Sequence, residues 1–199
     1  MTPLKIYGNA RSGNCLKVKW TAEWLGLPYT WHEIDTVKGE TREAAYLARF
    51  PLGQVPAVAF DDGRCLAQSN AIIRYLARGS TLLPVDDYLA AKADEWLFWE
   101  QYSHEPYIAV CRFHMVYKGQ PSETREPWRV ERGEVALDVM ERHLADRDWL
   151  VGGSMTVADI ALLAYSRVAH EGGFDLGHRP ALRAWIARGE TQLNLTQAA

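Results

Sequence analysis

The sequence predicts an α+β chain of two domains, a small sheet domain followed by an all-helical domain. Short apolar strands alternate with helical patterns over about the first 80 residues, and no convincing strand pattern follows. Between the two regions lies a stretch with Gly, Ser, Pro and two Asp residues, which is typical of a linker. We therefore expect the sheet domain at residues 1–79, the linker at 80–87 and the helical domain at 88–199.

The composition is that of an ordinary globular protein and argues against several kinds of partner. The net charge is −3 and no basic run is present, so we expect no nucleic acid. No apolar stretch approaches the roughly 20 residues that span a bilayer, so we expect no membrane partner. Cys15, Cys65 and Cys111 are widely spaced and indicate reduced thiols in the cytoplasm. The His-Glu pair at 104–105 lacks the second histidine of a zinc motif, and we expect no metal.

The sheet domain opens with a strand–helix–strand unit. An apolar strand at Leu4–Tyr7 is followed by a Gly-Asn turn and by a helix at Asn14–Leu25. Gly26 is suited to the left-handed conformation that ends a helix, and a second strand runs over Tyr29–Ile34. A right-handed crossover makes these two strands parallel neighbours.

The rest of the sheet domain is a short helix, a hairpin and a further helix. We expect the short helix at Glu40–Arg49 and a strand at Ala57–Phe60, which an Asp-Asp-Gly turn pairs with Arg64–Ala67. Ser69 is expected to cap a helix over Asn70–Ala77. The order βαβ, α, ββ, α is the thioredoxin-like arrangement.

The segment Gly53-Gln54-Val55-Pro56 leads into the hairpin. A proline donates no ladder hydrogen bond and belongs at a strand start or edge. We predict a cis Val55–Pro56 bond, which turns the backbone N–H and C=O of Val55 toward an extended peptide. An ordinary trans proline at a strand edge is the alternative.

The helical domain is predicted from apolar periodicity and capping signals. The expected helices are Tyr88–Tyr117, interrupted at Pro106, then Pro127–Leu144, Ile160–Tyr165 and Ala181–Glu190. Thr156-Val157-Ala158-Asp159 has the pattern of a capping box before the third of these. That helix is apolar on nearly every side, so we expect it at the centre of the domain.

Four features together resemble the cytosolic glutathione S-transferase family over nearly the whole chain. They are Ser12 after the first strand, Gly53–Pro56, Gln68-Ser69 before a helix, and the capping box at 156–159. The resemblance implies a thioredoxin-like domain that binds glutathione, a helical domain that supplies the pocket for an electrophile, and a homodimer.

Within the family the chain is similar to the bacterial and plant serine-type classes, through the segment Ser12–Val18. It does not resemble the tyrosine-type classes, because Tyr7 lies inside the first strand. Many relatives have Asn-Pro where this chain has Phe50-Pro51. We expect the asparagine of those relatives to serve the loop, so the presence of Phe50 here does not change the glutathione assignment.

The resemblance makes Ser12 and Asn14 the candidate catalytic residues. A hydroxyl at a helix N-terminus can donate to a glutathione thiolate, where the helix dipole also favours an anion. The amide of Asn14 could donate to the same sulfur. Either side chain could instead only cap the helix or serve the turn. Cys15 could be a reactive thiol near a helix N-terminus or a small buried side chain.

The remaining site residues are also implied by the resemblance. Gln68 and Ser69 would hold the γ-glutamyl carboxylate at a helix N-terminus, and plain capping is the alternative. The backbone of Val55, flanked by Gln54 and Pro56, would pair with the cysteine of glutathione.

Four further residues have weaker support. Lys38 and Arg42 lie where relatives place side chains that reach the glycyl carboxylate, with solvated surface charge as the alternative. Tyr107 and Phe113 belong to an aromatic stripe at helical spacing. We expect these two to contact the electrophile, while most such stripes are core.

The leading functional hypothesis is glutathione transferase chemistry on a small hydrophobic electrophile, in cytoplasmic detoxification. One alternative is a glutathione-dependent thiol–disulfide reductase or peroxidase that uses Cys15. A second is a transferase-like binding protein with little turnover.

Overall fold

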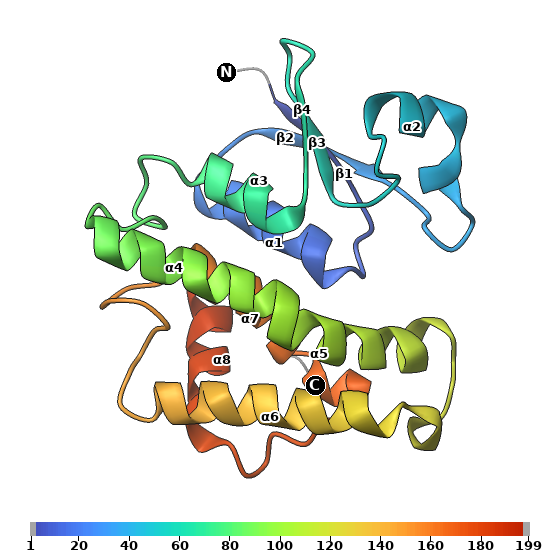
Figure 1. Cartoon of the computed structure of the whole chain (residues 1–199). Coiled ribbons are helices and arrows are strands. Elements are labelled where there is room, and N and C mark those ends of the chain that lie inside the picture. The colour runs from blue at the N-terminus through green and yellow to red at the C-terminus, as the bar shows by residue number, and fades with distance from the viewer. Residues whose placement is uncertain (1–2, 197–199) are drawn as a thin grey trace. The chain divides into compact units, whose positions relative to one another are not determined.

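The computed structural model describes residues 3–196, and the chain divides into two compact units between Leu83 and Pro84 (Figure 1). The division falls inside the stretch where the sequence predicts a linker. Each unit has its own set of secondary-structure elements and is described by itself.

The first unit contains a four-stranded mixed sheet with the strand order β2-β1-β3-β4. The strands are β1 Leu4–Gly8, β2 Tyr29–Glu33, β3 Ala57–Ala59 and β4 Cys65–Ala67. Strands β1 and β2 are parallel, whereas β3 is antiparallel to both β1 and β4. The predicted βαβ unit and hairpin are therefore confirmed, and the fold of this unit is thioredoxin-like.

Alternation along β1 divides the core between the two faces of the sheet. Ile6 lies opposite Val58 of β3, and both are fully buried. The helices α1 (Gly13–Trp24) and α3 (Ser69–Leu76) lie side by side next to the sheet (Figure 1). On the opposite face, Tyr7 packs against the aromatic rings of Tyr46 and Phe50.

Two details of this unit differ from the sequence-based expectation. The helix expected at Glu40–Arg49 is split into a 3₁₀ turn, Glu40–Arg42, and the helix α2, Ala44–Arg49. Glu43 between them is extended and breaks the helical hydrogen-bond ladder. The prediction that Ser69 is the N-cap of α3 is also wrong, because Gln68 occupies that position.

The second unit is helical, as predicted. Its α-helices are α4 Asp87–Trp99, α5 Glu105–Arg112, α6 Pro127–Leu144, α7 Val157–Ser166 and α8 Pro180–Gln192. Wider, π-helical turns occupy Glu100–His104 and Phe113–Tyr117, and 3₁₀ turns occupy Ser122–Thr124 and Ala169–Gly172. Pro106 interrupts the long pattern as expected, since it lies in the first turn of α5, where its missing N–H costs no hydrogen bond.

Helix α7 is the centre of the second unit. Every one of its residues is buried, as its uniformly apolar sequence predicts. The predicted capping box is formed: Thr156 accepts from the backbone N–H of Ala158 (3.3 Å), and Asp159 accepts from the backbone N–H of Thr156 (2.8 Å).

Candidate functional site

Ser12, the first candidate residue, stands at the N-cap of α1. Its backbone C=O accepts hydrogen bonds from the N–H groups of Cys15 and Leu16, at 3.0 and 2.9 Å, and so begins the helix. Its side chain makes no capping hydrogen bond, and its hydroxyl acts to lower the pKa of the neighbouring Cys15 thiol. A half-buried hydroxyl is thus present at a helix N-terminus, where the helix dipole favours an anion, without being used as a cap.

The loop that carries Ser12 is held in place from β2. The carboxylate of Glu33 accepts from the backbone N–H of Ala10 (3.0 Å) and from the indole N–H of Trp31 (2.7 Å). The ring of Trp31 lies so close to Gly8 that a Cβ there would be 2.6 Å from it, which explains the glycine at the end of β1. The sequence did not indicate Glu33, because its partners are set by the β1–β2 pairing.

Cys15 is fully buried one turn into α1. Its sulfur accepts from the backbone N–H of Asn9 (3.3 Å), and burial raises the pKa of its thiol to about 11. Burial therefore outweighs the Ser12 hydroxyl and the backbone N–H of Asn9, both of which favour the thiolate. The side chain is a thiol at neutral pH and packs as a small apolar group. This agrees with the second of the two interpretations from the sequence, a small buried side chain.

Asn14 belongs to a polar network between α1 and α3. Its Oδ1 accepts from the ammonium of Lys17 (2.8 Å) and from the hydroxyl of Ser69 (3.0 Å). Lys17 also donates to Oδ1 of Asn70 (3.4 Å), and its side chain is fully buried. The network joins the two helix N-termini that the sequence assigned to the sulfur and to the γ-glutamyl carboxylate of glutathione.

Lys17 and Asn70 were not anticipated from the sequence. The available signal was the position of Lys17 three residues before Trp20, on the buried side of α1. A charged residue on a buried helix face is uncommon unless it has partners.

The start of α3 has an unusual backbone. Gln68 has φ 71° and ψ 112°, a conformation with positive φ that L-residues rarely adopt. Such residues cost about 1–3 kcal/mol and cluster at ligand sites. The side chain of Gln68 donates to Oε1 of Gln54 (3.2 Å), which connects the start of α3 to the Gly53–Pro56 loop.

The Gly53–Pro56 loop holds its shape through Tyr46. The Val55–Pro56 bond is cis, as predicted. Gln54 precedes this bond, and its backbone C=O accepts a hydrogen bond from the hydroxyl of Tyr46 on α2 (2.8 Å). Within residues 3–196, the backbone N–H and C=O of Val55 form no hydrogen bond, so both can bind an extended ligand.

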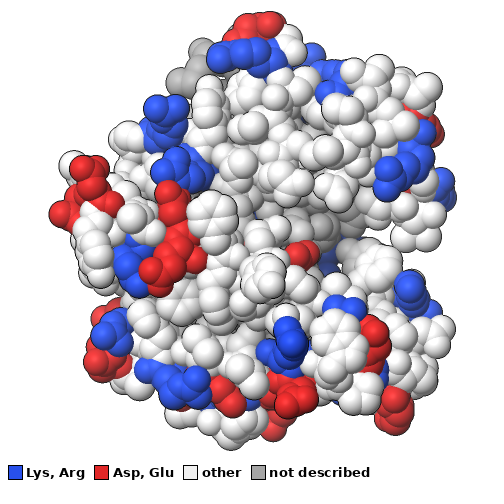
Figure 2. Space-filling view, in the orientation of Figure 1, with Lys and Arg blue, Asp and Glu red and all other residues white. Residues whose placement is uncertain are grey.

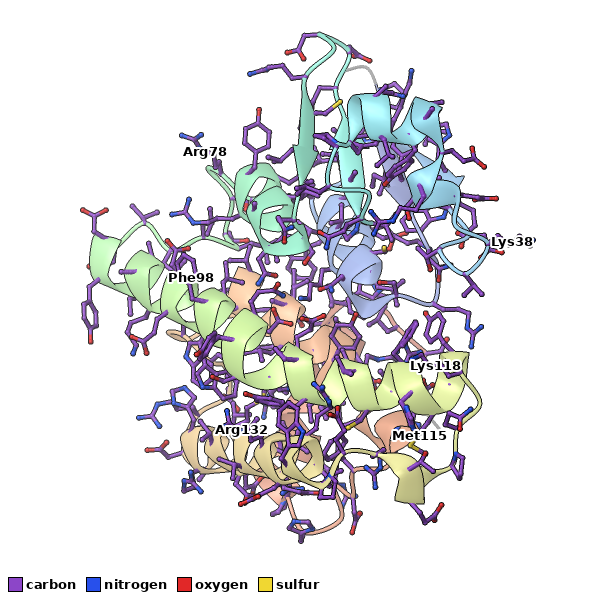
Figure 3. All side chains as sticks on the ribbon, turned by 45° about the vertical axis from the view of Figure 1, so that its right-hand side comes forward. Lys38, Arg78, Phe98, Met115, Lys118 and Arg132 are labelled. Atoms are coloured by element: carbon purple, nitrogen blue, oxygen red, sulfur yellow. The ribbon has the colours of Figure 1, made fainter. Side chains whose placement is uncertain are left out.

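The two candidate cations lie on either side of Glu40. Lys38 is on an exposed loop and forms an ion pair with Asp35 at 3.3 Å (Figure 3). The guanidinium of Arg42 lies against Gly53, where a Cβ would be 2.6 Å from Nη1. Arg42 therefore lies beside the Gly53–Pro56 loop, whereas Lys38 is paired with Asp35.

The two aromatic candidates of the helical unit have different surroundings. Tyr107 is buried in α5, and its hydroxyl accepts from Arg132 (3.2 Å). Phe113 is 43% exposed and stacks on Tyr117 with ring centroids 5.0 Å apart. The ammonium of Lys118 lies 5.7 Å from the Phe113 ring centroid.

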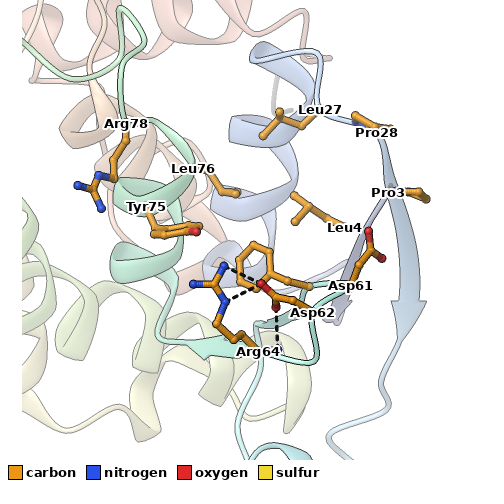
Figure 4. A pocket seen from close by; sticks show the side chains of 11 residues that line it. Pro3, Leu4, Leu27, Pro28, Asp61, Asp62, Arg64, Tyr75, Leu76 and Arg78 are labelled. Carbon is orange, nitrogen blue, oxygen red and sulfur yellow. Dashed lines mark hydrogen bonds and ion pairs between the residues drawn. The ribbon is translucent and has the colours of Figure 1, made fainter. Parts of the chain in front are cut away.

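A pocket on the first unit lies away from these residues. It has a volume of about 590 Å³ and is lined by Leu4, Leu27, Phe60, Arg64 and Tyr75, among others (Figure 4). Leu4 opens β1 and Gly8 closes it, about 13 Å further along the strand, so this pocket and Ser12 are at opposite ends of the sheet. We therefore do not place the candidate site in this pocket.

The described residues contain neither a cluster suited to a metal ion nor a helix suited to span a membrane. Among residues 3–196, no group of three His, Cys, Asp or Glu side chains is arranged to hold a metal ion. In the same part of the chain, no helix has the length and apolar character needed to cross a membrane.

On the face drawn in Figure 2, basic and acidic side chains are interspersed, in keeping with the net charge of −3.

Comparisons with known proteins agree with this geometry. The family model described as the glutathione S-transferase N-terminal domain matches residues 11–78, and that of the glutathione S-transferase C-terminal domain matches residues 102–192. Glutathione S-transferase 3 of Zea mays is 31% identical, over 93% of this chain and 88% of that protein.

Solved structures are similar over nearly the full length. The crystal structure of a glutathione S-transferase from Pseudomonas fluorescens Pf-5 is 48% identical, with a TM-score of 0.92 and 96% of each chain covered. That of a possible glutathione S-transferase from Rhodopseudomonas palustris is 40% identical, with a TM-score of 0.93 and 98% and 97% covered. The chain is an enzyme of the glutathione S-transferase family.

Proposed function

We propose that this protein conjugates glutathione to small hydrophobic electrophiles, with Ser12 donating a hydrogen bond to the glutathione thiolate. Members of the family use glutathione as co-substrate. The observation that carries the proposal is the Ser12 hydroxyl at the N-terminus of α1, which makes no capping bond. A donor and a helix dipole at that point both stabilise a negative sulfur.

The chemistry requires no nucleophile from the protein. The hydroxyl of Ser12 favours the ionised form of the glutathione thiol and so lowers its pKa. The thiolate attacks an electrophilic carbon, a C–S bond forms, and the leaving group departs with its electron pair. Asn14 is the second candidate donor, from the same turn of α1.

The other parts of glutathione would bind along α3 and the adjoining loop. The γ-glutamyl carboxylate would lie at the N-terminus of α3, near Gln68 and Ser69. The free backbone groups of Val55, between Gln54 and Pro56, would pair with the cysteine of glutathione as an added strand does.

Lys38 and Arg42 remain the candidates for the glycyl carboxylate. Arg42 is the better supported of the two, because its guanidinium lies against Gly53 while Lys38 is paired with Asp35. Of the two residues proposed to contact the electrophile, Phe113 is exposed and Tyr107 is buried. We therefore expect substitution of Phe113 to change the choice of electrophile more than substitution of Tyr107.

The redox alternative has less support. A reductase would need Cys15 as a thiolate, and burial raises its pKa to about 11. The binding-protein alternative predicts that glutathione binds without turnover.

The test is conjugation of glutathione to chlorodinitrobenzene by Ser12→Ala and Cys15→Ser variants. A charge-assisted hydrogen bond is worth roughly 1.5–3 kcal/mol, so Ser12→Ala should lower the conjugation rate by about ten- to a hundred-fold. Cys15→Ser should change it little. If Ser12→Ala kept full activity, Asn14 would become the leading donor and the serine-type assignment would be wrong. Disulfide reduction lost in Cys15→Ser would favour the redox alternative.

We also propose that the protein is a cytoplasmic homodimer of the bacterial serine-type group with a role in detoxification. Dimers are the rule in the family that the chain resembles. A solution mass near the 22.5 kDa of one chain, at micromolar concentration, would contradict the dimer.

A further inference from the structure

Lys17 is the charged residue at the centre of the polar network, and neither the sequence nor the proposed reaction gives it a role. Its side chain is fully buried, and its ammonium lies 2.8 Å from Oδ1 of Asn14 and 3.4 Å from Oδ1 of Asn70. Burying an ammonium is costly unless hydrogen bonds replace its water. The buried ammonium of Lys17 is therefore stabilised by the hydrogen bonds that it donates to partners such as Asn14 and Asn70.

The chemistry of the ammonium determines how the Asn14 amide is oriented. A side-chain amide has an oxygen that accepts and a nitrogen that donates, and the two ends have almost the same shape. An ammonium can only donate, so the end of Asn14 that faces Lys17 must be the oxygen. The nitrogen is then directed to the other side.

Ser69 could not impose this orientation by itself. Its hydroxyl lies 3.0 Å from the same oxygen of Asn14, but a hydroxyl can either donate or accept. It would pair equally well with the nitrogen of a reversed amide. The ammonium of Lys17, unlike the hydroxyl of Ser69, can pair only with the oxygen end of the Asn14 amide.

We propose that Lys17 is a positioning residue, which holds the amide of Asn14 so that its nitrogen is the end that can donate to the sulfur of bound glutathione. This inference rests on the proposed function, in which Asn14 is a donor to the thiolate. Lys17 itself touches no substrate in this arrangement and acts only through Asn14.

The experiment compares Lys17→Met, Lys17→Gln and Lys17→Arg with the wild type. The readout is the pKa of the bound glutathione thiol, from the pH dependence of thiolate absorbance in the complex, together with kcat/KM for conjugation. Methionine keeps the length of the chain but cannot donate. Glutamine can pair with either orientation of the amide, and arginine can only donate.

We expect Lys17→Met to raise the thiol pKa by about one unit and to lower kcat/KM about ten-fold at neutral pH. The thiol pKa and kcat/KM of Lys17→Gln should lie between those of Lys17→Met and the wild type. Those of Lys17→Arg should be close to the wild-type values. If the Lys17→Met variant does not fold, the other two variants test the same point. The thiol pKa should then be higher in Lys17→Gln than in Lys17→Arg.

Two controls separate positioning from a general effect on the fold. Lys19→Met removes a lysine from the same helix, where Lys19 is partly exposed and pairs only weakly with Glu23 at 3.9 Å, and it should leave the thiol pKa unchanged. In an Asn14→Ala background, Lys17→Met should have no further effect on the thiol pKa, because there is no amide to orient.

Unchanged thiol pKa values in folded Lys17→Met and Lys17→Gln variants that still conjugate glutathione would overturn the role of Lys17 alone. An equal effect of Lys17→Met with and without Asn14 would do the same. A wild-type protein that binds no glutathione would overturn both this inference and the proposed function.

Discussion

Two helices of this protein begin with a hydroxyl residue at the N-cap, and they use it in opposite ways. At α7, Thr156 and Asp159 close a capping box, and both are 2% exposed. At α1, Ser12 is half-buried and its side chain makes no capping bond. Both N-cap residues carry a hydroxyl, but only Thr156 is followed three residues later by a carboxylate. The hydrogen-bond partner, and not the hydroxyl itself, therefore distinguishes a structural cap from a donor available to a ligand.

Surroundings account for the difference. The carboxylate of Asp159 accepts from the backbone N–H of Leu150 (3.0 Å) and the indole N–H of Trp185 (2.9 Å), in addition to Thr156. It therefore ties a loop and a second helix to the start of α7. The start of α1 instead has Asn9 and Glu33 holding its loop from outside, and the Ser12 hydroxyl is not used as a cap.

The largest effect is expected at α7. Asp159→Ala removes the acceptor for three buried donors or more, and each unsatisfied donor costs about 1–3 kcal/mol. We expect the free energy of unfolding to fall by about 3 kcal/mol or more, measured by urea denaturation. Asp159→Asn keeps one acceptor oxygen and should lose less. An unchanged denaturation midpoint for Asp159→Ala would remove the contrast between the two helices.

The next effect concerns Cys15, at the α1 N-terminus. Its pKa is raised from an ordinary value of 9.0 to about 11, so the folded state holds the thiol proton longer than the unfolded state. The stability that this gives is fully present below pH 9 and is lost as the pH rises toward 11.

The measurement compares the wild type with Cys15→Ala between about pH 8 and about pH 10. The stability difference between them should shift by about 1.4 kcal/mol against the wild type over this range. Tyr29 also has a raised pKa but contributes equally in both proteins. The raised pKa of Tyr46 comes mainly from burial, which both proteins share, and in smaller part from Cys15 itself. A difference that stays constant with pH would mean that the thiol is less buried than the structure has it.

A smaller effect separates the two N-cap residues directly. Thr156→Ala should lower the free energy of unfolding by about 1 kcal/mol, which is typical for a lost cap. Ser12→Ala should change it by less than about 0.5 kcal/mol, because no capping bond is lost. Thermal melts of both variants check this. Equal losses at the two positions would return Ser12 to a purely structural role.

The smallest effect is a chemical one that leaves stability untouched. Cys65 is exposed, while Cys15 and Cys111 are buried with raised pKa values. A thiol reagent such as dithiobis-nitrobenzoate should therefore modify one cysteine rapidly in the native protein and all three after denaturation. Rapid modification of Cys15 in the native Cys65→Ser variant would revive the redox alternative.

Local signals made much of the fold predictable. The helix Pro127–Leu144 begins and ends as its proline and periodicity predict, and the capping box at Thr156 is formed as its four residues predict. The order of strands and helices in the first unit followed from short apolar runs and turn residues. The exceptions, Glu43 inside a helical pattern and Gln68 in place of Ser69 as a cap, are single positions where the backbone conformation was set by packing.

By itself, the sequence determined the two-part organisation, the cis Val55–Pro56 bond and the position of Ser12 at the start of a helix, because each depends on residues close together in the chain. Only the tertiary structure decided what the polar side chains contact. Lys17 meets Asn70 on a helix 53 residues away, and this contact exists only because α1 and α3 pack side by side. Partners so distant in sequence leave no local pattern, since packing brings them together and burial then makes each hydrogen bond between them necessary.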